Sequence, residues 1–313
     1  MKLVLLRPPR EFTRFRIQDG FLSDTTVKYI PSDTIYSLYL AKRYEEEPSL
    51  FKDPNKVEEI KDSEIPRITS AYPYIKENDN ITFYLPFFFT KSLMENLSIE
   101  PYYIKKFLNK FRNPYTFIKS EYAKILLEKG DISVLFNEDT FFTPKTIKIT
   151  RNKINRISTT TGEEGSLFTE EYVLCYQNKK EEVGFYFVIV EDCDEKIIDN
   201  FINKIKEFFE VRGIGADKST SNSTFKVEVK KAPKELVNVI NSFRKNNILL
   251  HTWPLLENYN SVFLRIRYLV IDELYLYPII SNGSLVEDSN IGRSKQLIKI
   301  KRRFANALEY RIF

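Results

Sequence analysis

Histidine is almost absent from this sequence. The chain has 313 residues and a single histidine, His251, which lies in the apolar stretch Ile248–Pro254. A packed histidine is more usual in such a stretch than a catalytic one, and most general-base mechanisms and many metal sites depend on histidine. We therefore expect no enzymatic activity, no metal site and no cofactor.

Cysteines and long apolar runs are also scarce. The two cysteines, Cys175 and Cys193, do not form a Cys-x-x-Cys pair. This spacing excludes a cysteine-based zinc site and suits a reducing compartment, and a disulfide between the two is possible but not required. The longest strongly apolar run, Val183–Val190, is far shorter than a membrane span, and residues 1–10 hold too short an apolar run for a signal peptide. We expect a soluble, cytoplasmic protein with no membrane partner.

The length and composition of the chain predict two packed domains. A hydrophobic share of 42% with 14% aromatic residues is ample for two cores and excludes bulk disorder. The periodicity predicts an α+β protein made of two ferredoxin-like (RRM-type) β-α-β-β-α-β domains with helical and hairpin insertions, at residues 1–140 and 141–313. The predicted strands are 2–7, 66–73, 81–85, 145–156, 165–176, 183–191, 225–229, 249–253 and 262–271, and the predicted helices are 32–44, 102–111, 115–129, 194–210 and 236–244.

Positive charge is segregated along the chain, although the formal net charge is only +5. Residues 140–162 and 289–308 contain no acidic residue. The first segment carries Lys145, Lys148, Arg151, Lys153 and Arg156, and the second carries Arg293, Lys295, Lys299, Lys301, Arg302 and Arg303. The N-terminal segment adds Arg7, Arg10, Arg14 and Arg16, interleaved with Phe12 and Phe15. Cations that follow phosphates and rings that stack on bases suit single-stranded nucleic acid, whereas each run taken alone also fits a solvated surface.

Two loops contain groups that contact phosphates. The segment 213–223 contains Gly213 and Gly215, which allow close backbone approach, and then Lys218, Ser219 and Thr220. The segment 159–165, expected between two strands, offers the hydroxyls of Thr160 and Thr161. An ordinary turn and an ordinary hairpin loop are the alternatives, and the acidic residues Asp217, Glu163 and Glu164 favour them.

Four segments in order resemble the fourth subunit of type III-A CRISPR Csm complexes. Ile30–Leu38 is similar to a Ser-Asp-Thr-Leu-Phe-Ser-Ala motif of that family, and Thr69–Ile75 with Tyr84–Pro86 is similar to its Ser-Ser-Ala-Phe-Pro-Tyr…Phe-Leu-Pro block. The segment 151–168 resembles its Arg-Asn-x-Ile-Asp-Arg…Gly-x-Leu-Phe block, and 213–225 falls where the family has a glycine-rich loop. The chain departs from the family pattern at Pro31, at Ala216 and at Ser221–Ser223.

The resemblance implies a non-catalytic RNA-binding subunit of the repeat-associated (RAMP) superfamily. Such a subunit holds the repeat-derived 5′ handle of the crRNA and joins the large polymerase-like subunit of the complex to the backbone subunits. We predict RNA contacts from Ser32, Arg151, Asn152, Arg156, Thr160, Thr161, Gly213, Gly215, Lys218, Ser219 and Thr220, and, on charge alone, from Arg10, Arg14 and Arg16.

Three alternatives stay open at this stage. The chain could be the equivalent subunit of a Cmr or type III-D complex, although the Ser70–Tyr74 block favours Csm. It could be a metal-independent repeat-RNA endoribonuclease of the same superfamily, although the N-terminal half lacks the histidine that such enzymes usually use. It could also be an interaction protein with no role in RNA binding.

Overall fold

The structure, a computed structural model, describes residues 1–17, 25–48, 65–88, 115–152, 167–190, 193–215, 223–246 and 248–250. Beyond these it describes the backbone of short strands at 253–254, 264–270, 274–280, 299–300 and 303–304.

The centre of the fold is an antiparallel sheet. Strand β1 (Lys2–Arg7) lies between β11 (Lys226–Lys231) and β10 (Glu181–Val190), and β4 (Tyr72–Glu77) pairs with the other edge of β10. Leu3–Leu6 and Val183–Ile189 are buried throughout. Continuous apolar runs of this length are typical of strands that are covered on both faces.

Two helices complete a ferredoxin-like unit with these four strands. Helix α1 (Ser32–Glu46) follows β1, and α7 (Glu195–Glu207) follows β10, which gives the β-α-β-β-α-β order with spatial strand order β11-β1-β10-β4. The carboxylate of Asp194 caps α7 by accepting the N–H of Lys196 at 2.9 Å. The two helices pack through aromatic rings, with the Phe201 centroid 5.0 Å from that of Tyr39.

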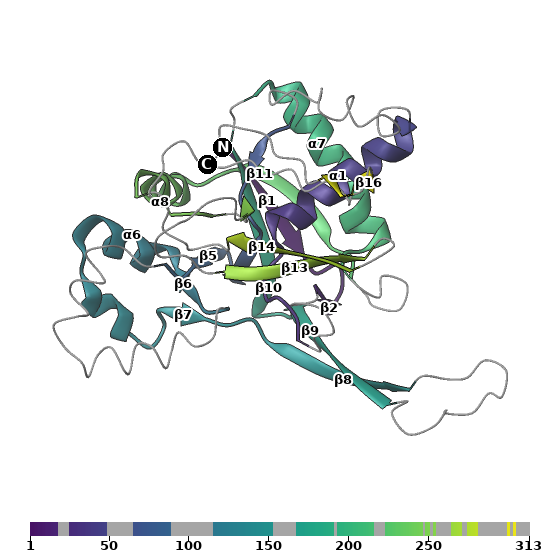
Figure 1. The fold of residues 1–313 in the computed structure, drawn as a ribbon. Coiled ribbons are helices and arrows are strands. Elements are labelled where there is room, and N and C mark those ends of the chain that lie inside the picture. Colours follow the sequence, from purple (N-terminus) through teal and green to yellow (C-terminus); the bar gives the residue numbers. More distant parts are fainter. Residues whose placement is uncertain are drawn as a thin grey trace.

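The segment between β4 and β10 adds strands and a helix, which packs against a helix that follows β11. Strand β5 (Asn80–Pro86) pairs with β4, and β6 (Phe117–Lys119) and β7 (Phe141–Phe142) follow. Helix α6 (Ser120–Lys129) packs against α8 (Lys234–Lys245), and the 3-10 helix η2 (Ile132–Phe136) follows α6. Figure 1 shows α1 and α7 on one side of the central sheet and α6 and α8 on the other.

A two-stranded ribbon extends from this body. It consists of β8 (Thr146–Asn152) and β9 (Leu167–Gln177), and Figure 1 shows it reaching away from the central sheet. Strand β2 (Phe12–Phe15) pairs with β9 near the body, and β9 also joins β10. Strand β3 (Arg67–Ile68) pairs with β10. Strands β12 (Trp253–Pro254), β13 (Leu264–Val270) and β14 (Leu274–Ile280) form a separate sheet. Strand β15 (Lys299–Ile300) pairs with β16 (Arg303–Phe304).

The α+β class with an antiparallel sheet is confirmed, and one ferredoxin-like unit is present. The second unit stays a prediction, as does the division at residue 140. A division there would separate β1 from β10 and β11, the two strands that hydrogen-bond to it.

Several local predictions need correction. Residues 12–15 form β2, a strand that is absent from the prediction, and 117–119 form β6 instead of the first turn of the helix predicted at 115–129. The predicted helix 102–111 lies outside the described residues. Both cysteines are free. Within the described ranges no helix has the length and apolar content of a membrane span, and no three His, Cys, Asp or Glu side chains cluster as metal ligands would.

Candidate nucleic-acid interface

One face of the β2-β9-β8 sheet collects basic and aromatic side chains. Side chains two residues apart in a strand share a face, and directly paired residues lie side by side. Phe12 is paired with Tyr176, and Arg151 is paired with Phe168. Since residues 168, 170, 172 and 176 of β9 share one face, Phe12 and Arg151 lie on that face as well. We call it the basic–aromatic face: Phe12, Arg14, Lys145, Arg151, Phe168, Glu170, Tyr172 and Tyr176.

Three arginines from two distant segments meet on this face, at Tyr172 and Glu170. The guanidinium carbons of Arg14 and Arg151 lie 5.4 and 5.6 Å from the centroid of the Tyr172 ring. These distances are within the range of cation–π attraction. Arg151 also donates from Nη2 to the Tyr172 hydroxyl at 2.5 Å.

Glu170 is the carboxylate that holds this group together. It accepts hydrogen bonds from Nη1 of Arg16 at 2.6 Å and from the hydroxyl of Tyr172 at 2.8 Å, and it forms an ion pair with Nε of Arg151 at 3.2 Å. We call Arg14, Arg16, Arg151, Glu170 and Tyr172 the arginine cluster. Because Glu170 and Arg16 are each only 7% exposed, each would be costly to bury without the other.

Positive charge is concentrated in the arginine cluster. Among the described residues, Arg16 and Arg151 share the carboxylate of Glu170, and Arg14 lies beside them over the Tyr172 ring. Nε of Arg14 is buried and has no hydrogen-bond partner within the described part of the chain. A buried donor that lacks an acceptor, beside two further guanidinium groups, suits an anionic ligand such as a phosphate.

Residues 213–215, which we call the glycine segment, lie against Arg16 of the arginine cluster. Gly213 and Gly215 have positive φ values of 75° and 78°. A Cβ on Gly215 would overlap the carbonyl oxygen of Arg16, and one on Gly213 would overlap the hydroxyl of Ser223. The close approach that these glycines allow is therefore to the protein itself. Contact of either residue with RNA stays a prediction.

The other predicted site residues are distributed differently. Arg10 is exposed in the bend before β2, and Asn152 ends β8, where only its backbone is described. Ser32 is 1% exposed, and its N–H donates to the Ser70 hydroxyl at 3.0 Å, so its surroundings are those of the core. Arg156, Thr160, Thr161, Lys218, Ser219 and Thr220 lie outside the described residues.

Sequence reasoning missed Glu170, Tyr172 and Tyr176. Lys145 places its ammonium 5.1 Å from the centroid of Tyr176, and burial together with the neighbouring Glu181 raises the pKa of the Tyr176 hydroxyl to about 12. The sequence pattern that could have identified them is an alternation along β9, in which every second position is Phe168, Glu170, Tyr172, Leu174 and Tyr176.

Arg7 differs from the three clustered arginines because carboxylates surround it. Its Nε and Nη2 donate to Glu182 at 3.0 and 2.6 Å, and Nη1 donates to Glu228 at 3.2 Å. Tyr74 donates to the same Glu182 carboxylate at 2.5 Å, and burial followed by this carboxylate raises the pKa of the Tyr74 hydroxyl. These partners balance the charge of Arg7, which indicates a structural role.

No protein-family model and no curated protein matches the sequence. Solved structures do match. In a crystal structure of the Csm3–Csm4 subcomplex of the type III-A CRISPR–Cas interference complex, the similar chain has 17% identity and a TM-score of 0.61, with 100% of this chain and 99% of the other covered. A chain of the Csm1–Csm4 cassette in complex with cA4 has 15% identity and a TM-score of 0.53, with 99% and 94% covered.

Csm4 is the subunit common to these structures. The chain has a Csm4-like fold. The resemblance indicated by the four sequence segments is thus confirmed at the level of the fold.

Proposed function

We propose that this chain is the non-catalytic RNA-binding subunit of a cytoplasmic type III CRISPR interference complex. In this role it anchors the 5′ handle of the crRNA and bridges the large polymerase-like subunit and the backbone subunits. The Csm4-like fold supports the proposal, since the similar chains were crystallised with Csm3 in one case and with Csm1 in the other.

The observation that carries the proposal is the convergence of Arg14, Arg16 and Arg151. Arg14 and Arg16 come from the N-terminal segment and Arg151 from β8, more than a hundred residues later, yet they meet at Tyr172 and Glu170. The three guanidinium groups of the arginine cluster suit a phosphate, because guanidinium groups bind phosphate oxygens in a forked geometry.

Aromatic side chains beside the arginine cluster extend the proposed site to the bases. Phe12 and Phe168 lie on the same basic–aromatic face and are 47% and 41% exposed. Proteins recognise single-stranded RNA by holding its phosphates with cations while unpaired bases stack on rings. Both kinds of group are available on this face.

We further propose that the chain forms a second ferredoxin-like unit. The pairing of α6 with α8, on the side of the central sheet opposite α1 and α7, supports it. Two such units would give the chain one body for RNA and further surface for its protein partners.

The test compares two cations of the same strand, Arg151 and Lys148. Arg151 lies on the basic–aromatic face, whereas Lys148 pairs with Glu171 and faces the opposite way. Arg151→Gln and Lys148→Gln each remove one positive charge. We expect Arg151→Gln to weaken binding of a handle-containing RNA by roughly tenfold or more, because a charge-assisted hydrogen bond contributes about 1.5–3 kcal/mol.

Lys148→Gln should change the affinity by less than about threefold, since a peripheral charge contributes little at physiological salt. Equal effects of the two variants would show that the ribbon acts only through its total charge. The same preparations, incubated with repeat RNA in EDTA, should show no cleavage. Metal-independent cleavage would favour the endoribonuclease alternative.

A further inference from the structure

We infer that Arg212 is a positioning residue, which fixes where the glycine segment meets the N-terminal arginine segment. The inference rests on the proposed function, because it assigns to Arg212 the geometry of the RNA site and no RNA contact. Arg212 is the last residue before Gly213, at the C-terminal end of the helical segment that begins with α7.

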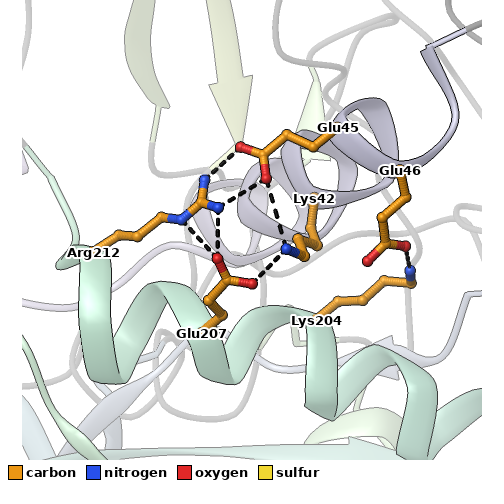
Figure 2. Close-up of polar contacts among 6 residues, drawn as sticks. All are labelled: Lys42, Glu45, Glu46, Lys204, Glu207 and Arg212. Atoms are coloured by element: carbon orange, nitrogen blue, oxygen red, sulfur yellow. Dashed lines mark hydrogen bonds and ion pairs between the residues drawn. The ribbon is translucent and has the colours of Figure 1, made fainter.

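The side chain of Arg212 is tied to both helices of the ferredoxin-like unit. It donates from Nε at 2.9 Å and from Nη2 at 2.5 Å to Glu207 of α7, and from Nη2 at 2.8 Å to Glu45 of α1. Lys42 of α1 approaches Glu207 at 2.5 Å and Glu45 at 3.7 Å. Figure 2 shows these four charges as a closed ring between the helices.

The backbone beside Arg212 has an uncommon form. Residues Phe208–Arg212 form a π-helical turn, η3, which closes when the N–H of Gly213 donates to the carbonyl of Phe208 at 2.8 Å. The guanidinium of Arg212 lies 4.8 Å from the centroid of the Phe208 ring, across the same turn. π-Helical turns are rare. The contacts of Arg212 with Glu207, Glu45 and the Phe208 ring stabilise this one.

The turn determines the position of the next residues. Ile214 donates its N–H to the carbonyl of Ser223 at 3.2 Å, and Gly215 lies against the carbonyl of Arg16. Arg16 in turn holds Glu170 of the arginine cluster. A continuous series of contacts therefore runs from Glu45 of α1 to the proposed phosphate site.

A second ion pair between the same helices provides a matched control. Lys204 of α7 pairs with Glu46 of α1 (Figure 2), eight residues before Arg212 and away from the turn. Lys204→Gln removes one α1–α7 ion pair as Arg212→Gln does, but it leaves the π-helical turn and its contacts intact. Arg212→Lys keeps the charge and loses the forked geometry.

The experiment measures hydrogen exchange of the Gly213 and Ile214 amides and the affinity for handle RNA in the full-length chain. For Arg212→Gln we expect roughly tenfold faster exchange of these amides and an affinity loss of about threefold to tenfold, because local opening becomes easier. Lys204→Gln should match the wild-type protein in both readouts, and Arg212→Lys should fall between.

Equal exchange rates in Arg212→Gln and Lys204→Gln would overturn the inference. So would faster exchange with unchanged RNA affinity, provided that Arg151→Gln lowers that affinity, because the turn would then not position the RNA site. If neither Arg151→Gln nor Arg212→Gln lowers the affinity, the proposed function fails first, and the inference fails with it.

Discussion

At the scale of single residues, Glu170 and Glu171 are adjacent carboxylates with opposite roles. Glu170 faces the guanidinium groups of Arg16 and Arg151, whereas Glu171 accepts the Thr146 hydroxyl at 2.7 Å and the N–H of Thr26 at 3.2 Å on the other face. A glutamine at 171 keeps an oxygen for these neutral donors. A glutamine at 170 presents its own NH₂ group to donors and removes the negative charge that Arg16 and Arg151 share.

We therefore predict that Glu170→Gln lowers the free energy of unfolding by about 3–5 kcal/mol, the usual effect of breaking a buried ion pair. Glu171→Gln should lower it by about 1 kcal/mol or less. Urea unfolding of both variants measures the difference. Equal losses would contradict a special role for Glu170.

The residues of the arginine cluster were only partly predictable. The acid-free and arginine-rich segments indicated Arg14, Arg16 and Arg151 as cations for RNA, and the structure brings them together. Glu170 and Tyr172 could not be identified as their partners, because that depends on the register of β9 against β2 and β8. A shift of one residue would move both to the opposite face.

At the scale of elements, the glycine segment should be sensitive to added bulk at one position. Gly215→Ala combines a positive φ with overlap on the Arg16 carbonyl, so the backbone of one segment must move. Gly130, which ends α6 with φ 64°, has the left-handed conformation as well and lies at the other helix pair. We predict that Gly130→Ala destabilises the protein by about 1–2 kcal/mol without altering RNA affinity.

Gly215→Ala should destabilise the protein more than Gly130→Ala and also weaken RNA binding, because it displaces Arg16. Thermal unfolding and RNA titration of the two variants give the comparison. If Gly215→Ala binds RNA like the wild type, the glycine segment and the arginine cluster act independently.

The end of α7 illustrates what periodicity cannot supply. The apolar spacing predicted a helix at 194–210, and the structure has an α-helix at 195–207. The π-helical turn that follows depends on Glu45, which is more than 160 residues away in the sequence. Such a change of helix type follows from tertiary contacts and not from local sequence.

At the scale of the whole molecule, the ring of charges between α1 and α7 predicts a pH dependence. Arg212 lowers the pKa of Glu45, and Lys42 followed by Arg212 lowers the pKa of Glu207, both below the ordinary value of 4.5. A carboxylate whose pKa is lower in the folded state stabilises the fold above its unfolded pKa, and this contribution is lost as the pH falls through the folded pKa.

The free energy of unfolding should therefore decrease as the pH falls below about 4.5. This decrease should be smaller in Arg212→Gln, because the pKa values of Glu45 and Glu207 rise towards the ordinary value in that variant. Urea midpoints of wild type and variant between neutral and acidic pH measure it. The same decrease in both proteins would show that the ring of charges does not contribute.

The pairing of the central sheet was also beyond sequence reasoning. Local patterns located β1, β10 and β11 as separate strands, yet β1 lies between two strands that follow it by about 180 and 220 residues. Partner choice over such separations is set by how whole faces are buried. The prediction of a domain boundary at residue 140 used local patterns alone and did not take the burial of whole faces into account.

The most direct test of the central claim is UV crosslinking of crRNA in the complex that co-purifies with this chain, with crosslinked peptides and nucleotides both mapped. We predict crosslinks from 5′-handle nucleotides to peptides that contain Phe12 and Arg14, and to peptides that contain Arg151, Phe168 or Tyr172. These crosslinks should be lost in an Arg14→Gln/Arg151→Gln variant that still assembles. Handle crosslinks confined to other subunits, with the same RNA content in the variant, would contradict the account.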